Sequence, residues 1–245
     1  MAGRAVANMQ NDPIRYNRTE DDLAQDESDD PSSGRILIVE DHAMMAQTLA
    51  MSLSARGYEC EIAGLRDAAS VREQSARFRA DLVLLDLHLG SIDSLDLIPA
   101  FRATGSQVLV VSGSNDEPRL VAALALGTLG WVRKAEPFEQ LLDAVVRALQ
   151  GRTIFPSARH EELAAEGREQ LAAERETRSR VSRLTPRERE VLVALSEGRS
   201  VQEIADQQYV SVATVRSHVQ GILSKLGVSN QLAAVALARR YLTPG

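Results

Sequence analysis

The sequence predicts a doubly wound α/β domain with a five-stranded parallel sheet, followed by a smaller all-α domain of four helices. Short apolar runs alternate with helical segments between residues 35 and 149, whereas residues 183–245 show helical periodicity and repeated helix-start signals. A length of 245 residues, with 44% hydrophobic and 25% charged residues, suits a soluble protein of one or two domains.

Five short runs rich in Val, Leu and Ile are typical of strands buried on both faces of a sheet. They cover residues 36–39, 58–63, 81–86, 107–112 and 131–133. Segments with helical spacing follow at 43–56, 67–78, 95–101, 118–126 and 138–149. Each right-handed crossover lays its helix on one face of the sheet, so five such units within residues 34–150 imply a doubly wound parallel sheet.

The composition of the chain sets further expectations. Residues 1–33 hold eight acidic and three basic residues, which predicts a disordered acidic tail. Cys60 is the only cysteine, so an internal disulfide is excluded and a reducing compartment is indicated.

The four histidines lack metal-ligand spacing, which argues against zinc, and we expect His42 and His88 at the rim of any site. Without a membrane-spanning run or a signal-peptide core, a cytoplasmic protein with no membrane partner is predicted.

Polar side chains end four of the predicted strands. Glu40 and Asp41 follow the first strand, Asp86 the third, Ser112 the fourth and Lys134 the fifth. Ligands bind at the carboxyl ends of strands in open α/β sheets, so we expect these groups to share one crevice. Each has an ordinary alternative, since acids and serines often end strands and lysines are usually solvated. Together they indicate a Mg²⁺ site beside an aspartate that is able to accept a phosphoryl group.

Residues 151–182 are dense in Glu and Arg. Pairs at i,i+4 spacing, such as Glu174 with Arg178, favour a solvated helix. We therefore expect a charged helical linker. A weak dimer contact through Leu163 and Leu171 is the alternative.

The last segment, 183–245, predicts a helix-turn-helix. Thr185 and Ser200 each open a capping box, and Ser211 begins a longer helix that reaches about residue 226. A short helix, a turn and a longer helix form the pattern whose second helix enters the major groove of DNA. Arg216 and Gln220 lie opposite the apolar face of that helix and suit base edges, although a merely solvated face has the same pattern.

Residues 35–149 resemble the receiver domain of bacterial two-component response regulators, which has the flavodoxin-like fold. The resemblance implies that Asp86 is the phosphoacceptor, with Ser112 and Lys134 binding the phosphoryl group and Trp131 in the place of the switch aromatic. It implies Mg²⁺ as cofactor, held by Asp41, Asp86 and the backbone carbonyl of His88, with Glu40 acting through water. Two positions depart from the family pattern, because His88-Leu89-Gly90 replaces Met-Pro-Gly and Ala135 replaces proline.

The stretches from Leu184 to Leu192, from Ser211 to His218 and from Lys225 to Val228 resemble the DNA-binding domain of the LuxR/NarL group, also called FixJ. This resemblance implies DNA contacts by Thr214, Arg216, Ser217, Gln220 and Lys225. It also implies a fourth helix, residues 230–241, that forms the dimer through Asn230, Ala234, Leu237 and Tyr241.

These observations predict a transcription regulator, not an enzyme, that binds DNA as a homodimer after phosphorylation of Asp86. The expected partners are DNA, a cognate sensor histidine kinase and, as a further candidate, RNA polymerase. We hypothesise that the unphosphorylated receiver masks the groove helix or the dimer helix. One alternative is a regulator that acts without phosphorylation. Another is a Mg²⁺-dependent aspartyl phosphohydrolase of the haloacid-dehalogenase type, although that class needs an Asp where this chain has His88.

Overall fold

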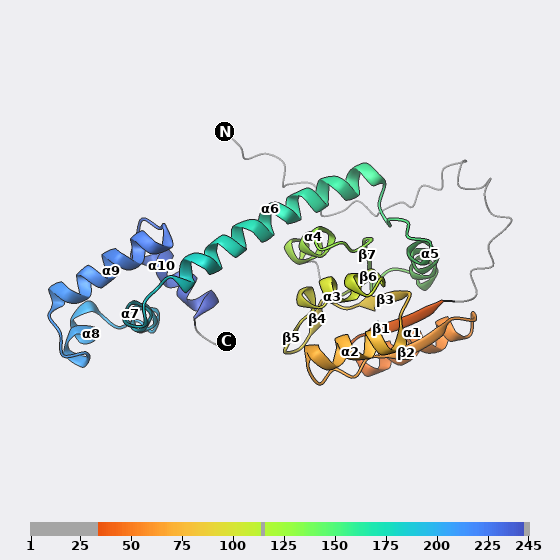
Figure 1. Cartoon of the computed structure of the whole chain (residues 1–245), viewed down its shortest axis with the longest axis horizontal. Coiled ribbons are helices and arrows are strands. Elements are labelled where there is room, and N and C mark those ends of the chain that lie inside the picture. Colours follow the sequence, from red (N-terminus) through yellow and green to blue (C-terminus); the bar gives the residue numbers. More distant parts are fainter. Residues whose placement is uncertain (1–33, 114–115, 243–245) are drawn as a thin grey trace.

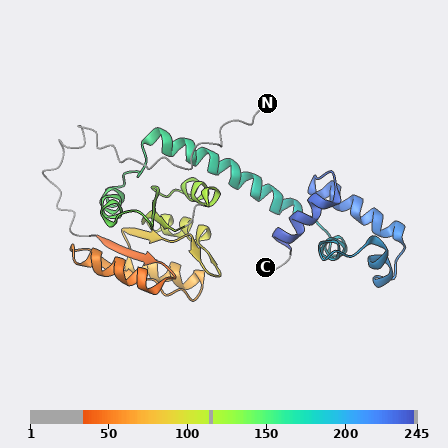
Figure 2. The ribbon, with the colours of Figure 1, turned by 180° about the vertical axis from the view of Figure 1, so that it is seen from behind.

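A computed structural model describes residues 34–113 and 116–242 of the chain. Figure 1 shows an α/β domain and a separate helical domain at opposite ends of one long helix, α6 (Ser157–Ser182). The same helix, seen from behind in Figure 2, runs beside the α/β domain before it reaches the helical domain. The tail predicted over residues 1–33 lies outside the described residues.

The α/β domain is built on five parallel strands in the order β2-β1-β3-β6-β7. This confirms the predicted doubly wound sheet, because the chain crosses over to build outward from β1 in both directions. The strands are β1 (Arg35–Val39), β2 (Glu59–Ile62), β3 (Leu82–Leu85), β6 (Gln107–Ser112) and β7 (Trp131–Arg133). In the register, Val39 pairs with Leu85 and Leu85 with Val110, which brings the carboxyl ends of β1, β3 and β6 to one edge.

Side chains alternate between two apolar layers along each central strand. In β1, Ile36 and Ile38 face one layer and Leu37 and Val39 the other. Helices α1 (Ala43–Ser54) and α5 (Phe138–Leu149) cover the first layer, while α2 (Ala68–Phe78), α3 (Ile98–Ala103) and α4 (Glu117–Ala125) cover the second. This two-sided burial explains why the strands are continuous apolar runs.

The loop after β3 is more ordered than the sequence predicted. It contains a small antiparallel hairpin, β4 (His88–Leu89) with β5 (Ile92–Asp93), and a 3₁₀ turn, η2 (Ser94–Asp96). The predicted helix over 95–101 therefore begins later, at Ile98, and the turn before it is 3₁₀. The side chain of Asp93 caps this turn by accepting from the backbone N–H of Leu95.

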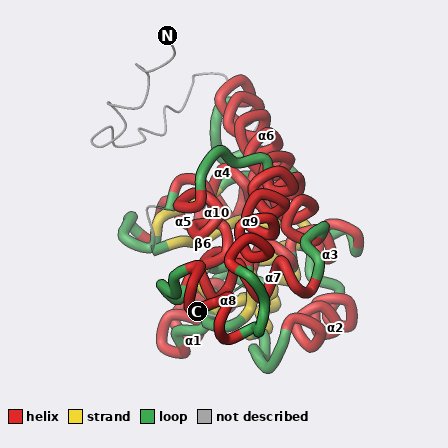
Figure 3. Tube along the Cα trace, turned by 90° about the vertical axis from the view of Figure 1, so that its left-hand side faces the viewer, coloured by secondary structure: helices red, strands yellow, loops and turns green. Residues whose placement is uncertain are grey.

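Helix α6 is part of the α/β domain over its first half. Leu163 and Ala164 are buried in the same apolar layer as Leu120 and Val121 of α4. A Cβ on Gly167 would lie 2.1 Å from the carbonyl oxygen of Val121, so the two helix backbones are in direct contact there. In Figure 3, which looks along the long axis of the molecule, α6 lies over α4. The prediction of a purely solvated helical spacer is therefore wrong for residues 157–167.

The helical domain contains α7 (Pro186–Ser196), α8 (Val201–Gln207), α9 (Val212–Leu226) and α10 (Gln231–Tyr241). The capping boxes predicted at Thr185 and Ser200 both form, and the side chain of Ser211 caps α9. The core of this domain includes Val181 from the end of α6. Within the described part of the chain, no single helix is long and apolar enough to cross a bilayer; only α9 and α10, joined across a 70° bend, have that length and composition together.

Candidate functional site

The polar groups that end β1, β3 and β7 come together at one edge of the sheet. The ammonium nitrogen of Lys134 lies 2.8 Å from Oδ2 of Asp86 and 2.5 Å from Oε2 of Glu40. Asp86 is 3% exposed and Glu40 5%, so both carboxylates are almost fully removed from solvent. Buried charges are tolerated when they are paired and hydrogen-bonded, and Lys134 provides the positive charge for both.

The pairing with two carboxylates shifts the acid–base equilibrium of Lys134. Partial burial acts to lower the pKa of its ammonium, but the hydrogen bonds to Asp86 and Glu40 outweigh that effect and the pKa is raised. Lys134 therefore stays fully protonated at neutral pH. It places a fixed positive charge against the Asp86 carboxylate.

Two further residues complete the acidic cluster. The ligand atoms of Glu40, Asp41, His42 and Asp86 all lie within 4.8 Å of one another. The Nδ1 atom of His42 is 2.9 Å from carboxylate oxygens of Glu40 and of Asp41, while its side chain is 72% exposed. His42 thus lies at the rim, as expected, but it touches the acids more closely than the sequence indicated. His88 is exposed, and its backbone N–H donates to Oδ1 of Asp86 at 3.2 Å.

This cluster fits a small divalent cation. Mg²⁺ binds oxygen ligands and typically takes one or two carboxylates together with water. Three carboxylates from the ends of β1 and β3 supply such oxygens around one point, and only Asp41 among them is exposed to solvent. Glu40, Asp41, Asp86 and the backbone carbonyl of His88 are therefore suitable candidates to hold the ion.

Ser112 and Trp131 lie on the neighbouring strands. Ser112 is 1% exposed at the end of β6, where its carbonyl accepts from the backbone N–H of Lys134. Trp131 is 8% exposed, and its indole packs edge-on against Phe155 with ring centroids 4.4 Å apart. Among the described residues, its Nε1 is buried without a hydrogen-bond partner. The sequence did not indicate Phe155, which lies two residues before the start of α6 and packs against the tryptophan.

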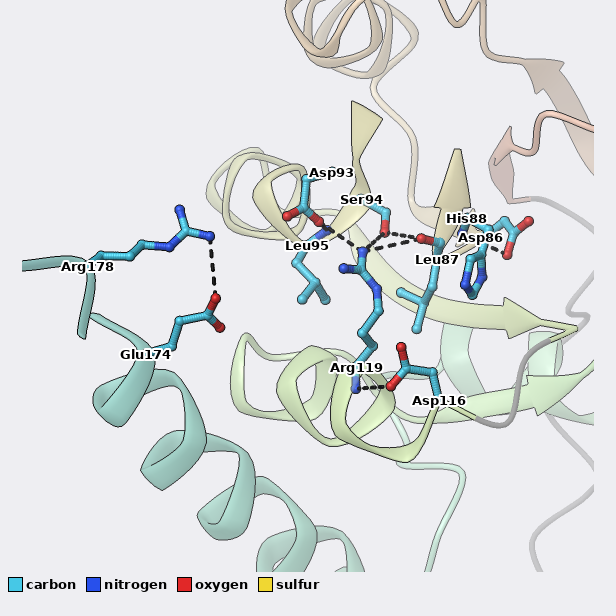
Figure 4. Close-up of polar contacts among 10 residues, drawn as sticks. All are labelled: Asp86, Leu87, His88, Asp93, Ser94, Leu95, Asp116, Arg119, Glu174 and Arg178. Atoms are coloured by element: carbon cyan, nitrogen blue, oxygen red, sulfur yellow. Dashed lines mark hydrogen bonds and ion pairs between the residues drawn. The ribbon is translucent and has the colours of Figure 1, made fainter. Parts of the chain in front are cut away.

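Another residue near the site escaped the sequence interpretation altogether. Arg119 of α4 reaches the loop that follows Asp86 and contacts Leu87, Asp93 and Ser94, as Figure 4 shows. No local residue spacing and no sequence motif indicated a role for this arginine, because its partners are 25 to 32 residues away in sequence.

In the helical domain, α9 presents a polar face to solvent. Thr214, Arg216, Ser217 and Gln220 are exposed, while Val215, Ile222 and Leu226 are buried in the core. The predicted division of this helix into an apolar and a polar face is therefore present. Because these four side chains are exposed, the hypothesis that the receiver masks the groove helix does not hold in this conformation.

Lys225, predicted to contact the DNA backbone, takes part in an internal ion pair. Its Nζ lies 2.6 Å from Oε2 of Glu188, which is 7% exposed and also accepts from the backbone and hydroxyl of Thr185. Burial acts to raise the pKa of Glu188, but the hydrogen bonds from Lys225 and Thr185 prevail and the pKa is lowered. No sequence pattern indicated this pair, which joins α9 to α7.

The predicted dimer residues of α10 mostly face inward. Ala234 is 1% exposed in the core, Leu237 and Tyr241 pack against that core, and Asn230 caps the helix. The dimer role expected for Ala234 is thus corrected, because a side chain in the core of its own domain is not available to a second copy. Leu232, 80% exposed, is the large apolar side chain that α10 presents to solvent.

Comparison with known proteins agrees with this architecture. A family model described as "Response regulator receiver domain" matches residues 36–146, and one described as "Bacterial regulatory proteins, luxR family" matches residues 182–238. The chain is 32% identical to a "Probable transcriptional regulatory protein NarL" of Mycobacterium tuberculosis, covering 86% of this chain and 95% of the relative. It is 31% identical to the "Nitrate/nitrite response regulator protein NarP" of Escherichia coli, covering 83% and 93%. Among solved structures, the response regulator ChrA is 29% identical over 85% of this chain and 98% of its own, with a TM-score of 0.42.

The parallel sheet with its acidic edge and the helix-turn-helix define a two-domain response regulator, with a receiver followed by a DNA-binding domain. The chain belongs to the LuxR/NarL family of two-component transcription regulators. Members of this family bind DNA and regulate transcription, which argues against the phosphohydrolase alternative.

Proposed function

We propose that this protein controls transcription by accepting a phosphoryl group on Asp86, from a sensor histidine kinase, and by binding DNA as a dimer when phosphorylated. The observation that carries the proposal is the position of Asp86. Its carboxylate is buried at the sheet edge, is paired with Lys134 and is surrounded by the carboxylates of Glu40 and Asp41.

In the transfer, a carboxylate oxygen of Asp86 forms the new bond to phosphorus. The bond between phosphorus and the donor atom breaks, and its electron pair leaves with the donor. Lys134 neutralises charge on the transferred group, and Ser112, which ends the neighbouring strand β6, donates a hydrogen bond to it. Mg²⁺ would be held by Asp41, Asp86 and the carbonyl of His88, with Glu40 acting through water, and would supply further neutralisation of the phosphoryl oxygens.

On the DNA side, Arg216 is the first candidate for base recognition. It is exposed in the second turn of α9, and an arginine in this setting is able to donate two hydrogen bonds to guanine. Thr214, Ser217 and Gln220 accompany it on the exposed face. For the dimer we propose a contact centred on Leu232, because the other candidate positions of α10 cap the helix or pack against the core. The protein is proposed to act in the cytoplasm, with RNA polymerase as a candidate partner.

The test is phosphorylation of the full-length protein by acetyl phosphate with Mg²⁺, followed on phosphate-affinity gels. Asp86→Asn should abolish the phosphorylated species, while Asp93→Asn, a carboxylate seven residues away on the exposed hairpin, should retain it. Phosphorylation that persists in Asp86→Asn would refute the assignment of the acceptor.

A further inference from the structure

Arg119 connects helix α4 to the acceptor loop, residues 87–95. Its Nη2 donates to Oδ1 of Asp93 at 2.9 Å, to Oγ of Ser94 at 3.2 Å and to the carbonyl oxygen of Leu87 at 3.3 Å. Figure 4 shows the side chain leaving α4 and ending among these three acceptors. The guanidinium is always charged, and the two N–H groups of Nη2 are shared among the three acceptors.

The contact with Leu87 is close to the chemistry. The Leu87–His88 peptide accepts from Arg119 and from Ser94 at its oxygen, and its N–H donates to Oδ1 of Asp86. One peptide group therefore joins the proposed phosphoacceptor to the arginine. Hydrogen bonds in such a chain polarise one another, so a change at one end affects the other.

Arg119 also lies at the start of α4. It is the third residue of α4, and its backbone N–H donates to the capping carboxylate of Asp116. Ser112 ends β6 shortly before this cap. A movement of the start of α4 therefore either carries the acceptor loop with it through the bonds of Arg119 or breaks those bonds.

Helix α4 in turn holds α6. The close approach at Gly167, together with the buried Leu163 and Ala164, fixes the first half of α6 on α4. At its other end α6 belongs to the helical domain, because Val181 lies in that core and Nη1 of Arg180 donates to the carbonyl oxygen of Leu226, the last residue of α9. A continuous set of contacts thus leads from Asp86 to the DNA-binding helix.

We propose that Arg119 is a positioning residue that transmits phosphorylation of Asp86 to α4 and α6, and so to α9. This inference rests on the proposed function. Phosphorylation turns the carboxylate into an acyl phosphate, in which one carboxylate oxygen bridges carbon and phosphorus, and this changes the acceptor offered to the Leu87–His88 peptide. From Gly167 to Val181, α6 extends about 21 Å, so a tilt of about 10° on α4 displaces its far end by about 4 Å.

The experiment compares DNA affinity with and without phosphorylation in the full-length protein. Arg119→Met keeps the aliphatic length and removes the donors, while Arg72→Met makes the same change on the exposed face of α2. Each protein is treated with acetyl phosphate and Mg²⁺, and the phosphorylated fraction is measured on phosphate-affinity gels. Affinities at equal phosphorylated fractions are then measured by anisotropy, on a labelled duplex selected from a random-sequence pool by the wild-type protein.

In the wild type and in Arg72→Met, phosphorylation should raise DNA affinity about 5- to 150-fold, the usual range for coupled sites. In Arg119→Met this gain should fall below about twofold, while the affinity of the unphosphorylated protein stays at the wild-type value. A gain equal to the wild type in Arg119→Met overturns the inference. If Arg119→Met does not fold, Asp93→Ala removes the acceptor of the shortest bond of Arg119 instead. A gain reduced relative to the wild type then supports the inference, and an unchanged gain overturns it. A wild type without any gain overturns the proposed function itself.

Discussion

Replacing Gly167 by alanine tests whether α6 is docked on α4. In an exposed helix interior this change stabilises a protein by about 1 kcal/mol, because glycine is a poor helix former. Here the added Cβ would lie 2.1 Å from the carbonyl oxygen of Val121 and 2.9 Å from Cβ of Ala125. A normal carbon–oxygen contact is about 3.3 Å or longer, so the two backbones must separate by more than about 1 Å.

Separation of the helices loosens the contacts of Leu163 and Ala164, which are 4% and 5% exposed. Overpacking of this kind costs about 1–3 kcal/mol, so the net effect is a destabilisation of up to about 2 kcal/mol. Urea unfolding followed by the fluorescence of Trp131, the single tryptophan, reports on the receiver directly. Ala172→Gly, on the exposed face of α6, is the control, because it measures how much the difference in helix propensity between alanine and glycine changes the stability of the same helix. If Gly167→Ala instead stabilises the receiver by about 1 kcal/mol, α6 is not docked as described.

Three further predictions concern the helical domain. Arg216→Ala should reduce the discrimination between the selected duplex and single-base variants of it by about 1–3 kcal/mol, measured by anisotropy, and an unchanged preference contradicts a base contact. Lys225→Met should lower the free energy of unfolding of the helical domain by about 1–3 kcal/mol, measured by urea unfolding, because Glu188 then keeps its charge in a buried site without its partner. A stability equal to that of the wild type contradicts the ion pair. Because the pKa of Glu188 is lowered on folding, its ionisation stabilises the domain above the unfolded pKa of 4.5, and this stability is lost as the pH falls through the folded pKa. Thermal unfolding between pH 7 and 3 should therefore show a smaller acid-induced loss in Glu188→Gln than in the wild type, and identical pH profiles argue against the shift.

The sheet was predictable from sequence because its strands are buried on both faces. Their apolar runs end sharply at polar residues, so β6 and β7 were predicted with their observed bounds. The polar residues at the ends of the strands also identified the acidic edge of the sheet. The helix-turn-helix was predictable for a similar reason, since Thr185, Ser200 and Ser211 mark the helix starts chemically. The hairpin of β4 and β5 was missed because strands of two residues have no period to detect.

The contacts that connect the two halves were not predictable in this way. The buried side of α6 is made of Leu163, Ala164 and Gly167 in a helix otherwise rich in charged residues, so its amphipathic pattern is weak. The one available signal was Gly167, since a glycine in the interior of a helix is unfavourable unless another backbone approaches it. The ion pair of Lys225 with Glu188 and the bonds of Arg119 join distant segments, and a single sequence carries no record of such pairings.

Control of DNA binding by phosphorylation of Asp86 is the property that the proposed function requires above all. Its most direct test is the affinity of the full-length protein for the selected duplex, measured for wild type and Asp86→Asn before and after treatment with acetyl phosphate and Mg²⁺. We predict that treatment raises the affinity of the wild type about 5- to 150-fold and leaves that of Asp86→Asn unchanged. Equal affinities of the treated and untreated wild type, or an equal gain in Asp86→Asn, would contradict control of DNA binding through Asp86.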